Sequence, residues 1–369
     1  MSQSFEEESQ HFWDGRDSAN HLAAFHICIW SLEVKSFAFS FIRRFIDCFI
    51  FTCPEYLMKT QLRWGLIMLC LGCCAFQAQA VDDSVRFQAG SYSYVLRADD
   101  RERSFLLHIP STYDGRKPFP LILMLHGRTG SGRSIEKYSG MSEIADAHEC
   151  IVAYPDALGF PTSWNTGFDT DPHQADDVAF LHALLLELQK KLSLDGARIF
   201  VAGHSSGALM AYRMGAGFSE TFAAIGAVAG SIGRTEPDGH IIAIPEAVQP
   251  VSVIAFHGRK DEYLPYDTAK RAIVKYGYFL PVADAMEYWI RRNGCASIPK
   301  KEVSSSGNIV KETYSGGKKG TEVVLYTIQD GNHRWPGDKT TAWFQGRANA
   351  EISATQLIWE FFDHHPKQP

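Results

Sequence analysis

A serine between two glycines stands directly after an apolar run of the chain. The segment Gly203-His-Ser-Ser-Gly207 follows the β-branched and aromatic run 197–202, and a helix-like stretch comes after it. This order is typical of a sharp strand-to-helix turn that lifts a serine hydroxyl clear of a sheet. The glycines leave room for the strained backbone of the turn, and the next helix points backbone N–H groups at the hydroxyl. The pattern predicts a nucleophilic Ser205, provided that its context supplies the partners of such a serine.

Two residues downstream have the right type and order to activate that serine. A serine hydroxyl is a poor nucleophile near neutral pH, so it needs a base and a carboxylate that orients the base. Asp261 follows the apolar run 251–256, and His333 lies in a loop rich in Gly and Pro after the run 321–328. In α/β-hydrolases the serine, the acid and the histidine follow strands in this chain order. Taken singly, Asp261 and His333 also fit a surface acid and a solvated histidine; together they predict a triad.

Attack on a carbonyl also needs N–H donors for the negative charge that develops on its oxygen. One donor is expected from Ser206, directly after the nucleophile, and the second from the loop after an early strand. In that loop Gly127 permits close approach of the backbone to a substrate, and Arg128, or alternatively Thr129, would supply the N–H. An ordinary glycine turn is the alternative interpretation of this loop.

Three loop residues are candidates for binding the substrate. Trp335 lies in the loop of His333, and Trp164 and Asn165 lie in a loop of their own earlier in the chain. Aromatic side chains in such loops bind flat or apolar substrates. We therefore expect these residues to line a substrate cleft, with packing in the core or at the rim as the alternative.

Three histidines beside glycines at predicted strand ends raise the question of a metal site. His126, His204 and His257 show neither the i, i+4 spacing nor the C-x-x-C spacing that metal sites use. We expect no metal there and assign all three histidines to packing or to loop hydrogen bonds.

The elements that must position these groups are strands alternating with helices. This alternation predicts an α/β fold, with a mostly parallel central sheet, helices on both faces and a single domain over 81–369. Alternating segments at 91–97 and 103–110 predict an antiparallel pair. Apolar runs predict strands at 120–125, 150–154, 197–202, 222–228, 251–256 and 321–328, the last as the second strand of a hairpin around Gly316-Gly317. Helical spacing predicts helices at 134–147, 178–192, 206–216, 282–293 and 350–362.

The segment before this domain has the features of an export signal. A positive stretch at 59–63 precedes an apolar stretch at 64–76, and Ala78-Gln-Ala80 forms a small-x-small cleavage site. We predict a signal peptide over 58–80, because the apolar stretch is too short for a membrane span. Cleavage after Ala80 would release a secreted protein, extracellular or periplasmic, without a stable membrane partner. Acylation at Cys73 is the less favoured alternative.

Residues 1–57 hold apolar clusters that charged residues interrupt, so they contain no clean transmembrane run. We interpret them as an upstream extension outside the fold, with a membrane-associated extension as the alternative. Six of the eight cysteines lie before Ala80, which leaves Cys150 and Cys295 in the mature chain. In an oxidising compartment these two could pair, but the sequence leaves the pairing open, since it does not give their separation.

The charge balance excludes one class of partner. A formal net charge of −6 and a pI near 6.2 give no basic footprint for nucleic acid. We expect the partner to be a small or polymeric substrate instead.

Seven motifs together resemble a known group of enzymes. Their order along 85–362 is similar to that of secreted esterases of the polyhydroxybutyrate depolymerase type, which are close to the feruloyl and acetylxylan esterases among carbohydrate esterases. The S-W-N, D-D-V and H-x-W-P-G elements are much more specific than G-x-S-x-G alone. The motifs are Leu125-His-Gly127, Ser163-Trp-Asn165, Asp176-Asp-Val-Ala-Phe-Leu181, Gly203-His-Ser-Ser-Gly207, Phe222-Ala-Ala-Ile225, His257-Gly-Arg-Lys-Asp261 and Gly331-Asn-His-Arg-Trp-Pro-Gly337.

The resemblance implies an α/β-hydrolase fold without metal or organic cofactor, with Ser205 as nucleophile, Asp261 as orienting acid and His333 as base. The chain departs from the group at His204, Ser206 and Arg128, which weakens any transfer of substrate identity.

The expected function is a serine esterase that forms an acyl-enzyme. Its substrates would be hydroxycinnamoyl or acetyl esters on polysaccharide, or hydroxybutyrate esters and their oligomers. Two alternatives stay open: a serine peptidase on the same fold, and a non-catalytic binding protein built on it.

Overall fold

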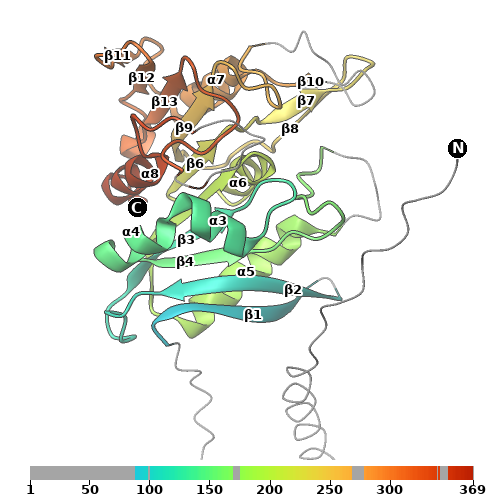
Figure 1. The fold of residues 1–369 in the computed structure, drawn as a ribbon, viewed down its shortest axis with the longest axis vertical. Helices are drawn as coiled ribbons and strands as arrows, with labels where there is room; N and C mark the ends of the chain where they lie inside the picture. Colours follow the sequence, from blue (N-terminus) through green and yellow to red (C-terminus); the bar gives the residue numbers. More distant parts are fainter. Residues whose placement is uncertain are drawn as a thin grey trace, which may run out of the picture. The chain divides into compact units, whose positions relative to one another are not determined.

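A ten-stranded sheet runs through the part of the chain that the computed structural model describes, namely residues 88–98, 100–168, 175–267, 278–338, 340 and 348–368. The extension 1–57 and the signal peptide predicted at 58–80 lie outside these residues. The strand order is β1-β2-β4-β3-β5-β6-β9-β13-β12-β11 (Figure 1). The bounds are β1 Gly90–Ala98, β2 Arg101–Ile109, β3 Phe119–Leu125, β4 Ile151–Pro155, β5 Leu194–His204, β6 Ala224–Val228, β9 Ser252–Gly258, β11 Lys300–Val303, β12 Ile309–Tyr314 and β13 Val323–Ile328.

The centre of the sheet is parallel and its edges are antiparallel. Strands β4, β3, β5, β6, β9 and β13 run parallel to their neighbours in this order. The β1–β2 hairpin joins β4 antiparallel at one edge, and β12 and β11 join β13 antiparallel at the other. Every residue of β3, β4, β6, β9 and β13 is buried, as expected for strands that are covered on both faces.

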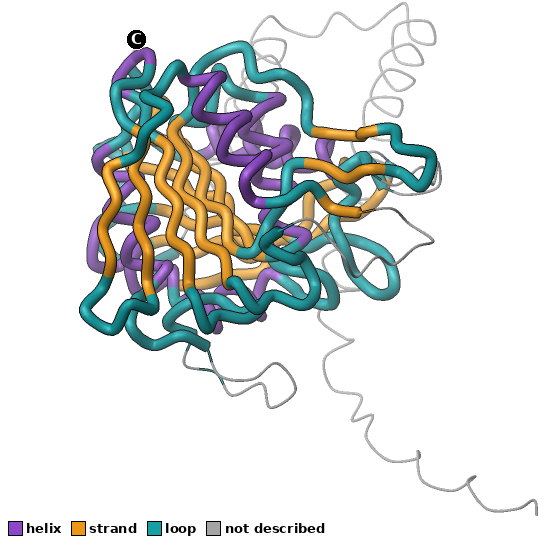
Figure 2. Tube along the Cα trace, turned by 90° about the horizontal axis from the view of Figure 1, so that it is seen from above, coloured by secondary structure: helices purple, strands orange, loops and turns teal. Residues whose placement is uncertain are grey.

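Alternate side chains of each central strand belong to two separate layers of the core. Helices α5 Asp177–Lys191, α6 Ser206–Gly217 and α7 Val282–Asn293 pack on one face of the sheet. Helices α3 Gly132–Ser139, α4 Met141–His148 and α8 Ala354–His364 pack on the other (Figures 1 and 2). The predicted α/β fold with helices on both faces is confirmed.

Three details differ from the sequence predictions. The helix predicted over 134–147 is two helices, because Gly140 adopts a left-handed conformation with φ 65° between α3 and α4. A small antiparallel sheet of β10 Tyr278–Phe279, β7 Gly233–Thr235 and β8 Ile241–Ala243 was not predicted. Strand β11 was missed as well. No helix among the described residues is long and apolar enough to cross a membrane.

The two cysteines of the predicted mature chain are free thiols. Cys150 is buried in the layer of α3, α4 and α8, whereas Cys295 packs against the layer of α5, α6 and α7. The sheet separates these layers, so the Cys150–Cys295 disulfide that the sequence left open is not formed in this structure.

Candidate active site

Ser205 occupies a strained turn between β5 and α6. Its backbone has φ 55° and ψ −121°, a combination that costs a non-glycine residue conformational energy. Its N–H donates to the carbonyl of Val228 at 2.9 Å, which ties the turn to the neighbouring strand β6. A Cβ at Gly203 would lie 2.3 Å from the carbonyl oxygen of Gly207, and one at Gly207 would lie 2.1 Å from that of Leu125. Both glycines are therefore required by backbone contacts on either side of the serine.

Three side chains from the carboxyl ends of parallel strands meet at this turn. His333 Nε2 lies 2.8 Å from Ser205 Oγ, and His333 Nδ1 lies 2.6 Å from Asp261 Oδ2. Ser205 follows β5, Asp261 follows β9 and His333 follows β13. With Asp261 ionised, Nδ1–H donates to the carboxylate, which leaves Nε2 free of a proton and able to accept the serine hydroxyl. The structure thus brings the three residues of the predicted triad into one hydrogen-bonded chain.

Asp261 is buried but held as an anion by its surroundings. Its Oδ1 accepts the N–H groups of Tyr263 and Leu264, both at 2.9 Å. Its Oδ2 lies 3.4 Å from His257 Nε2 in addition to the contact with His333. Burial alone would raise the pKa of Asp261, but the hydrogen bonds and charges of His257 and His333 outweigh it and hold the pKa well below its usual range. The carboxylate is therefore present at neutral pH to orient His333.

His257 contributes to the site in a way that sequence reasoning missed. Its ring is buried, and Nε2 lies 2.7 Å from the carbonyl oxygen of Leu264 as well as close to Asp261. His257 thus closes the loop that carries Asp261. The predicted role in loop hydrogen bonding agrees with this contact, but the prediction did not place His257 next to Asp261. The available signal was the i, i+4 spacing of His257 and Asp261 across a Gly-containing turn.

His204 places a second imidazole beside that of His333. The two ring centres are 5.3 Å apart, and His204 Nδ1 lies 3.3 Å from the hydroxyl oxygen of Tyr138. Burial, and secondarily the neighbouring His333, lower the pKa of His204 to about 3. His204 therefore carries no charge at neutral pH and does not compete with the charge that His333 would acquire.

The loop after β3 lies against Ser205, the candidate nucleophile. A Cβ at Gly127 would lie 3.3 Å from Ser205 Cβ, so the backbone of this loop reaches the serine at van der Waals distance. The N–H of Thr129 donates to the carbonyl of Thr162 at 2.8 Å. Since that N–H is used within the loops, Arg128 is the better of the two candidates for the second donor. The first candidate, Ser206, is the first residue of α6, where backbone N–H groups lack partners within the helix.

Trp164 supports this loop from inside the core. It is 3% exposed, and its indole N–H donates to the carbonyl of His126 at 2.8 Å. His126 Nε2 accepts the N–H of Ala157 at 3.0 Å, and its Nδ1 lies 2.7 Å from the carbonyl oxygen of Gly127. The prediction that Trp164 lines a cleft is contradicted by this burial, which places the indole beneath the loop.

The polar groups of Trp335 and Asn165 are likewise bonded within the protein. Trp335 is 1% exposed, and its indole N–H donates to Thr355 Oγ1 at 2.9 Å. The amide of Asn165 donates to the carbonyl of Ala175 and accepts the N–H of Gly167, both at 3.0 Å. Trp335 therefore does not line a cleft, because its polar atom finds its partner in the core, and Asn165 uses both ends of its amide to close its own loop.

An exposed tyrosine that sequence reasoning overlooked stands beside the histidine. Tyr263 is 64% exposed, and its ring centre lies 5.0 Å from that of His333. Its place two residues after Asp261 was the only signal in the sequence.

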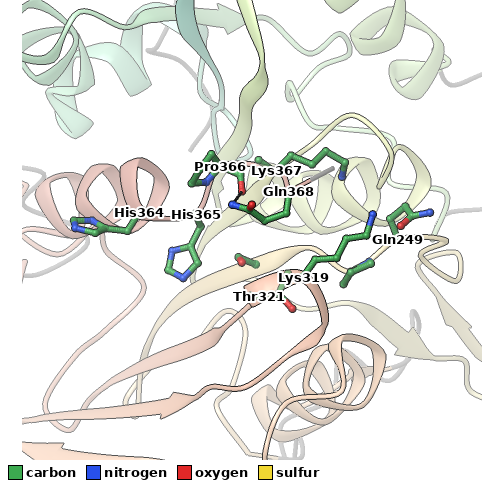
Figure 3. A pocket seen from close by; sticks show the side chains of 12 residues that line it. Gln249, Lys319, Thr321, His364, His365, Pro366, Lys367 and Gln368 are labelled. Carbon is green, nitrogen blue, oxygen red and sulfur yellow. Dashed lines mark hydrogen bonds between the residues drawn. The ribbon is translucent and has the colours of Figure 1, made fainter.

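A hollow of about 440 Å³ lies at the other end of the strands (Figure 3). Its lining includes Ala223 and Thr321, which precede β6 and β13, and Ser252, the first residue of β9, together with Lys319 and Lys367. Ser205, Asp261 and His333 follow their strands, so this hollow is separate from the candidate active site. In the described residues, no group of three or more His, Cys, Asp or Glu side chains is placed to hold a metal ion.

The fold agrees with the comparison to known proteins. The chain belongs to the alpha/beta hydrolase family, whose model matches residues 122–358. It is 30% identical to feruloyl esterase B from Piromyces equi over 65% of this chain and 44% of that protein. It is 27% identical to feruloyl esterase C from Emericella nidulans over 63% of this chain and 76% of that protein. Its fold is similar to that of an acetyl xylan esterase from Aspergillus awamori, with a TM-score of 0.51 and 15% identity over 74% of this chain and 99% of that one.

Proposed function

We propose that this protein is a serine esterase that cleaves carboxylic esters through an acyl-enzyme. The observation that carries the proposal is the hydrogen-bonded chain from Ser205 through His333 to Asp261, with contacts of 2.8 and 2.6 Å. Its position at the carboxyl ends of the parallel strands is where open α/β sheets bind their ligands.

In the proposed reaction, His333 Nε2 takes the proton of Ser205 as the serine oxygen attacks the ester carbonyl. The N–H groups of Ser206 and Arg128 would stabilise the oxyanion that forms in this step. The tetrahedral intermediate collapses, the bond to the alcohol oxygen breaks, and His333 returns the proton to that oxygen. Water then repeats the attack, and the acid leaves with Ser205 regenerated.

The substrate class that we propose is a hydroxycinnamoyl or acetyl ester on a polysaccharide. The similarity to feruloyl esterases and to an acetyl xylan esterase supports it. Hydroxybutyrate esters are the second candidate, because the order of the seven motifs also resembles the polyhydroxybutyrate depolymerase type. A screen of the mature protein against methyl ferulate, acetylated xylan and hydroxybutyrate oligomers separates the candidates by the product released.

The nucleophile is tested with p-nitrophenyl acetate and a fluorophosphonate probe. We expect Ser205→Ala to abolish hydrolysis and labelling while its circular dichroism and unfolding transition stay like those of the wild type. Ser93→Ala, at an exposed serine of strand β1, is the matched control and should keep both. Persistent turnover in Ser205→Ala would refute the serine mechanism. A wild-type protein that neither turns over nor takes the label would favour a non-catalytic binding protein instead.

A serine peptidase is the alternative reaction for the same triad. Both kinds of enzyme would cleave a reactive ester, so the deciding measurement is the hydrolysis of unactivated peptide amides. A serine peptidase should cleave such peptides, whereas a serine esterase should leave them intact.

We further propose that the protein is exported after cleavage at Ala80, as the signal-like segment 58–80 suggests. The N-terminal residue of the exported protein tests this directly. Val81 is expected, whereas a start within 1–57 would show that the extension is retained.

A further inference from the structure

Tyr263 combines a fixed backbone with an unburied ring. Its N–H donates to Asp261 Oδ1 at 2.9 Å, so the acid holds the residue in place. Its side chain nevertheless stays 64% exposed, and its ring is tilted by 43° over that of His333 at 5.0 Å between centres. Large aromatic side chains contribute most to stability when buried, so an exposed one beside a catalytic group is a candidate for contact with a ligand.

The reaction geometry decides which part of an ester this ring would meet. The carbonyl oxygen of the ester must point at the N–H groups of Ser206 and Arg128. The leaving oxygen must lie within reach of His333 Nε2, because that atom returns the proton to the alcohol. The alcohol part of the ester therefore lies on the His333 side of Ser205, which is the side where the ring of Tyr263 stands.

The exposure of the ring indicates the kind of alcohol. An enclosed pocket would suit a small alkyl group, whereas this ring is open to solvent and leaves room for an alcohol that continues beyond the site. A sugar ring has an apolar face of C–H groups that packs on an aromatic ring, while its hydroxyls stay in water. A simple methyl or ethyl ester has no such face and gains little from the contact.

We propose that Tyr263 determines specificity as the platform for the sugar ring of the alcohol. This inference rests on the proposed esterase function and deepens it, because it makes an ester of a saccharide hydroxyl the preferred substrate. Tyr263 acts by stacking on the leaving group and takes no part in proton transfer.

The test compares two ferulate esters that share the acyl group and differ only in the alcohol. We expect Tyr263→Ala to lower kcat/KM for a feruloyl xylo-oligosaccharide about tenfold, the loss of roughly one good aromatic contact. For methyl ferulate we expect a change of less than about twofold, since the backbone N–H that holds Asp261 remains. Tyr263→Phe keeps the ring and should keep both rates. Tyr92→Ala, at an exposed tyrosine of the edge strand β1, is the matched control and should alter neither.

The outcomes are distinguishable. An equal loss of kcat/KM on both esters would show that Tyr263 positions Asp261, and it would refute the proposal that its ring binds the sugar. No loss on either ester would show that the ring does not touch the leaving group. A wild-type enzyme that hydrolyses hydroxybutyrate oligomers but neither ferulate ester would also overturn it, while leaving the serine esterase mechanism intact. Persistent turnover in Ser205→Ala would instead refute the serine esterase mechanism on which this inference rests.

Discussion

The orienting role that we propose for Asp261 depends on its carboxylate being charged. One oxygen accepts two backbone N–H groups of its own loop, and the other faces the rings of His333 and His257. Because these contacts hold the carboxylate charged, His333 keeps its proton on Nδ1 and presents a bare Nε2 to Ser205. The charge of Asp261 thus holds both its own loop and the ring of His333 in place.

Replacing this acid should therefore cost activity more than structure. We expect Asp261→Asn to lower kcat for p-nitrophenyl acetate by about 10³ to 10⁴-fold, because an amide can donate to Nδ1 and so favours the wrong tautomer of His333. The measurement is steady-state kinetics at pH 7 and above. Asp267→Asn, at an exposed acid of the same segment, serves as control. A loss of less than tenfold in Asp261→Asn would show that the acid does not set the tautomer.

His204 gives the molecule a characteristic dependence of stability on pH. Its folded-state pKa is about 3, against an ordinary value of 6.5. Between these two values the unfolded chain binds a proton that the folded chain does not bind, so the free energy of unfolding falls as the pH falls. The stabilisation is complete above about pH 6.5, and the slope below it is about 1.4 kcal/mol per pH unit for this one group.

Urea unfolding at pH 7, 5 and 4 tests this expectation. His204→Gln removes the titrating ring, so its free energy of unfolding should fall less steeply with decreasing pH than that of the wild type. The absolute stability of the variant does not matter for this comparison. Parallel curves for the two proteins would show that His204 is protonated in the folded state or is not buried there.

At the scale of elements, the crossing of α6 over β3 fixes the nucleophile turn. A Cβ at Gly207 would lie 2.1 Å from the carbonyl oxygen of Leu125 and 2.5 Å from that of His126. These are backbone atoms within β3 and at its end, so they cannot rotate out of the way as a side chain would. The glycine thus allows the helix to start directly against the strand that leads to the candidate oxyanion loop.

Adding one methyl group at this crossing should be severely destabilising. We expect Gly207→Ala to lower the free energy of unfolding by about 2–4 kcal/mol, because overpacking against backbone forces α6 and β3 apart. Gly217→Ala is the matched control on the same helix, since the nearest atom to its added Cβ is Pro245 Cγ at 3.7 Å. Denaturant unfolding of both variants gives the comparison. Equal free energies of unfolding for Gly207→Ala and Gly217→Ala would mean that α6 can move away from β3 without destabilising the fold.

The elements that carry the triad could be predicted because their signals are local. The runs 251–256 and 321–328 are mostly apolar, and each leads into a turn with Gly, so Asp261 and His333 could be placed at strand ends. The helix predicted over 134–147 failed for a local reason as well, since only the backbone conformation of Gly140 separates two helices of similar pattern. Strands β7, β8 and β10 are three residues long or shorter, too short for any periodicity.

The parts of the site that could not be predicted depend on contacts between distant segments. Trp164 and Trp335 looked like cleft residues because they lie in loops, but their indole N–H groups are bonded to His126 and Thr355 inside the core. Nothing in the sequence around either tryptophan indicates those partners. The exposure of Tyr263 could not be predicted from the sequence either, because it depends on which residues of distant segments pack near its ring.

At the scale of the whole molecule, a buried ion pair joins the antiparallel edge of the sheet to helix α5. Arg103 of β2 donates to Asp177 Oδ1 at 2.5 Å, and both residues are at most 2% exposed. The guanidinium also lies 3.9 Å from the ring centre of Phe180. The second oxygen of Asp177 accepts the N–H of Asn165 at 2.7 Å. The pair therefore connects β2, helix α5 and the loop of Trp164, which supports the candidate oxyanion loop.

Breaking this pair should destabilise the whole fold more than any exposed ion pair could. Removing one partner leaves the other charged or polar group buried without compensation, and we expect Arg103→Leu to lower the free energy of unfolding by about 3–5 kcal/mol. Arg97→Leu, which removes an exposed contact of 4.0 Å to Asp100 from the adjacent strand, should have little effect. The double variant Arg103→Leu with Asp177→Leu leaves no unpaired charge, so it should cost less than the sum of the single variants by about 1–3 kcal/mol. Additive losses in urea unfolding would show that the two residues stabilise the molecule independently, so that their ion pair does not hold the β1–β2 hairpin to helix α5.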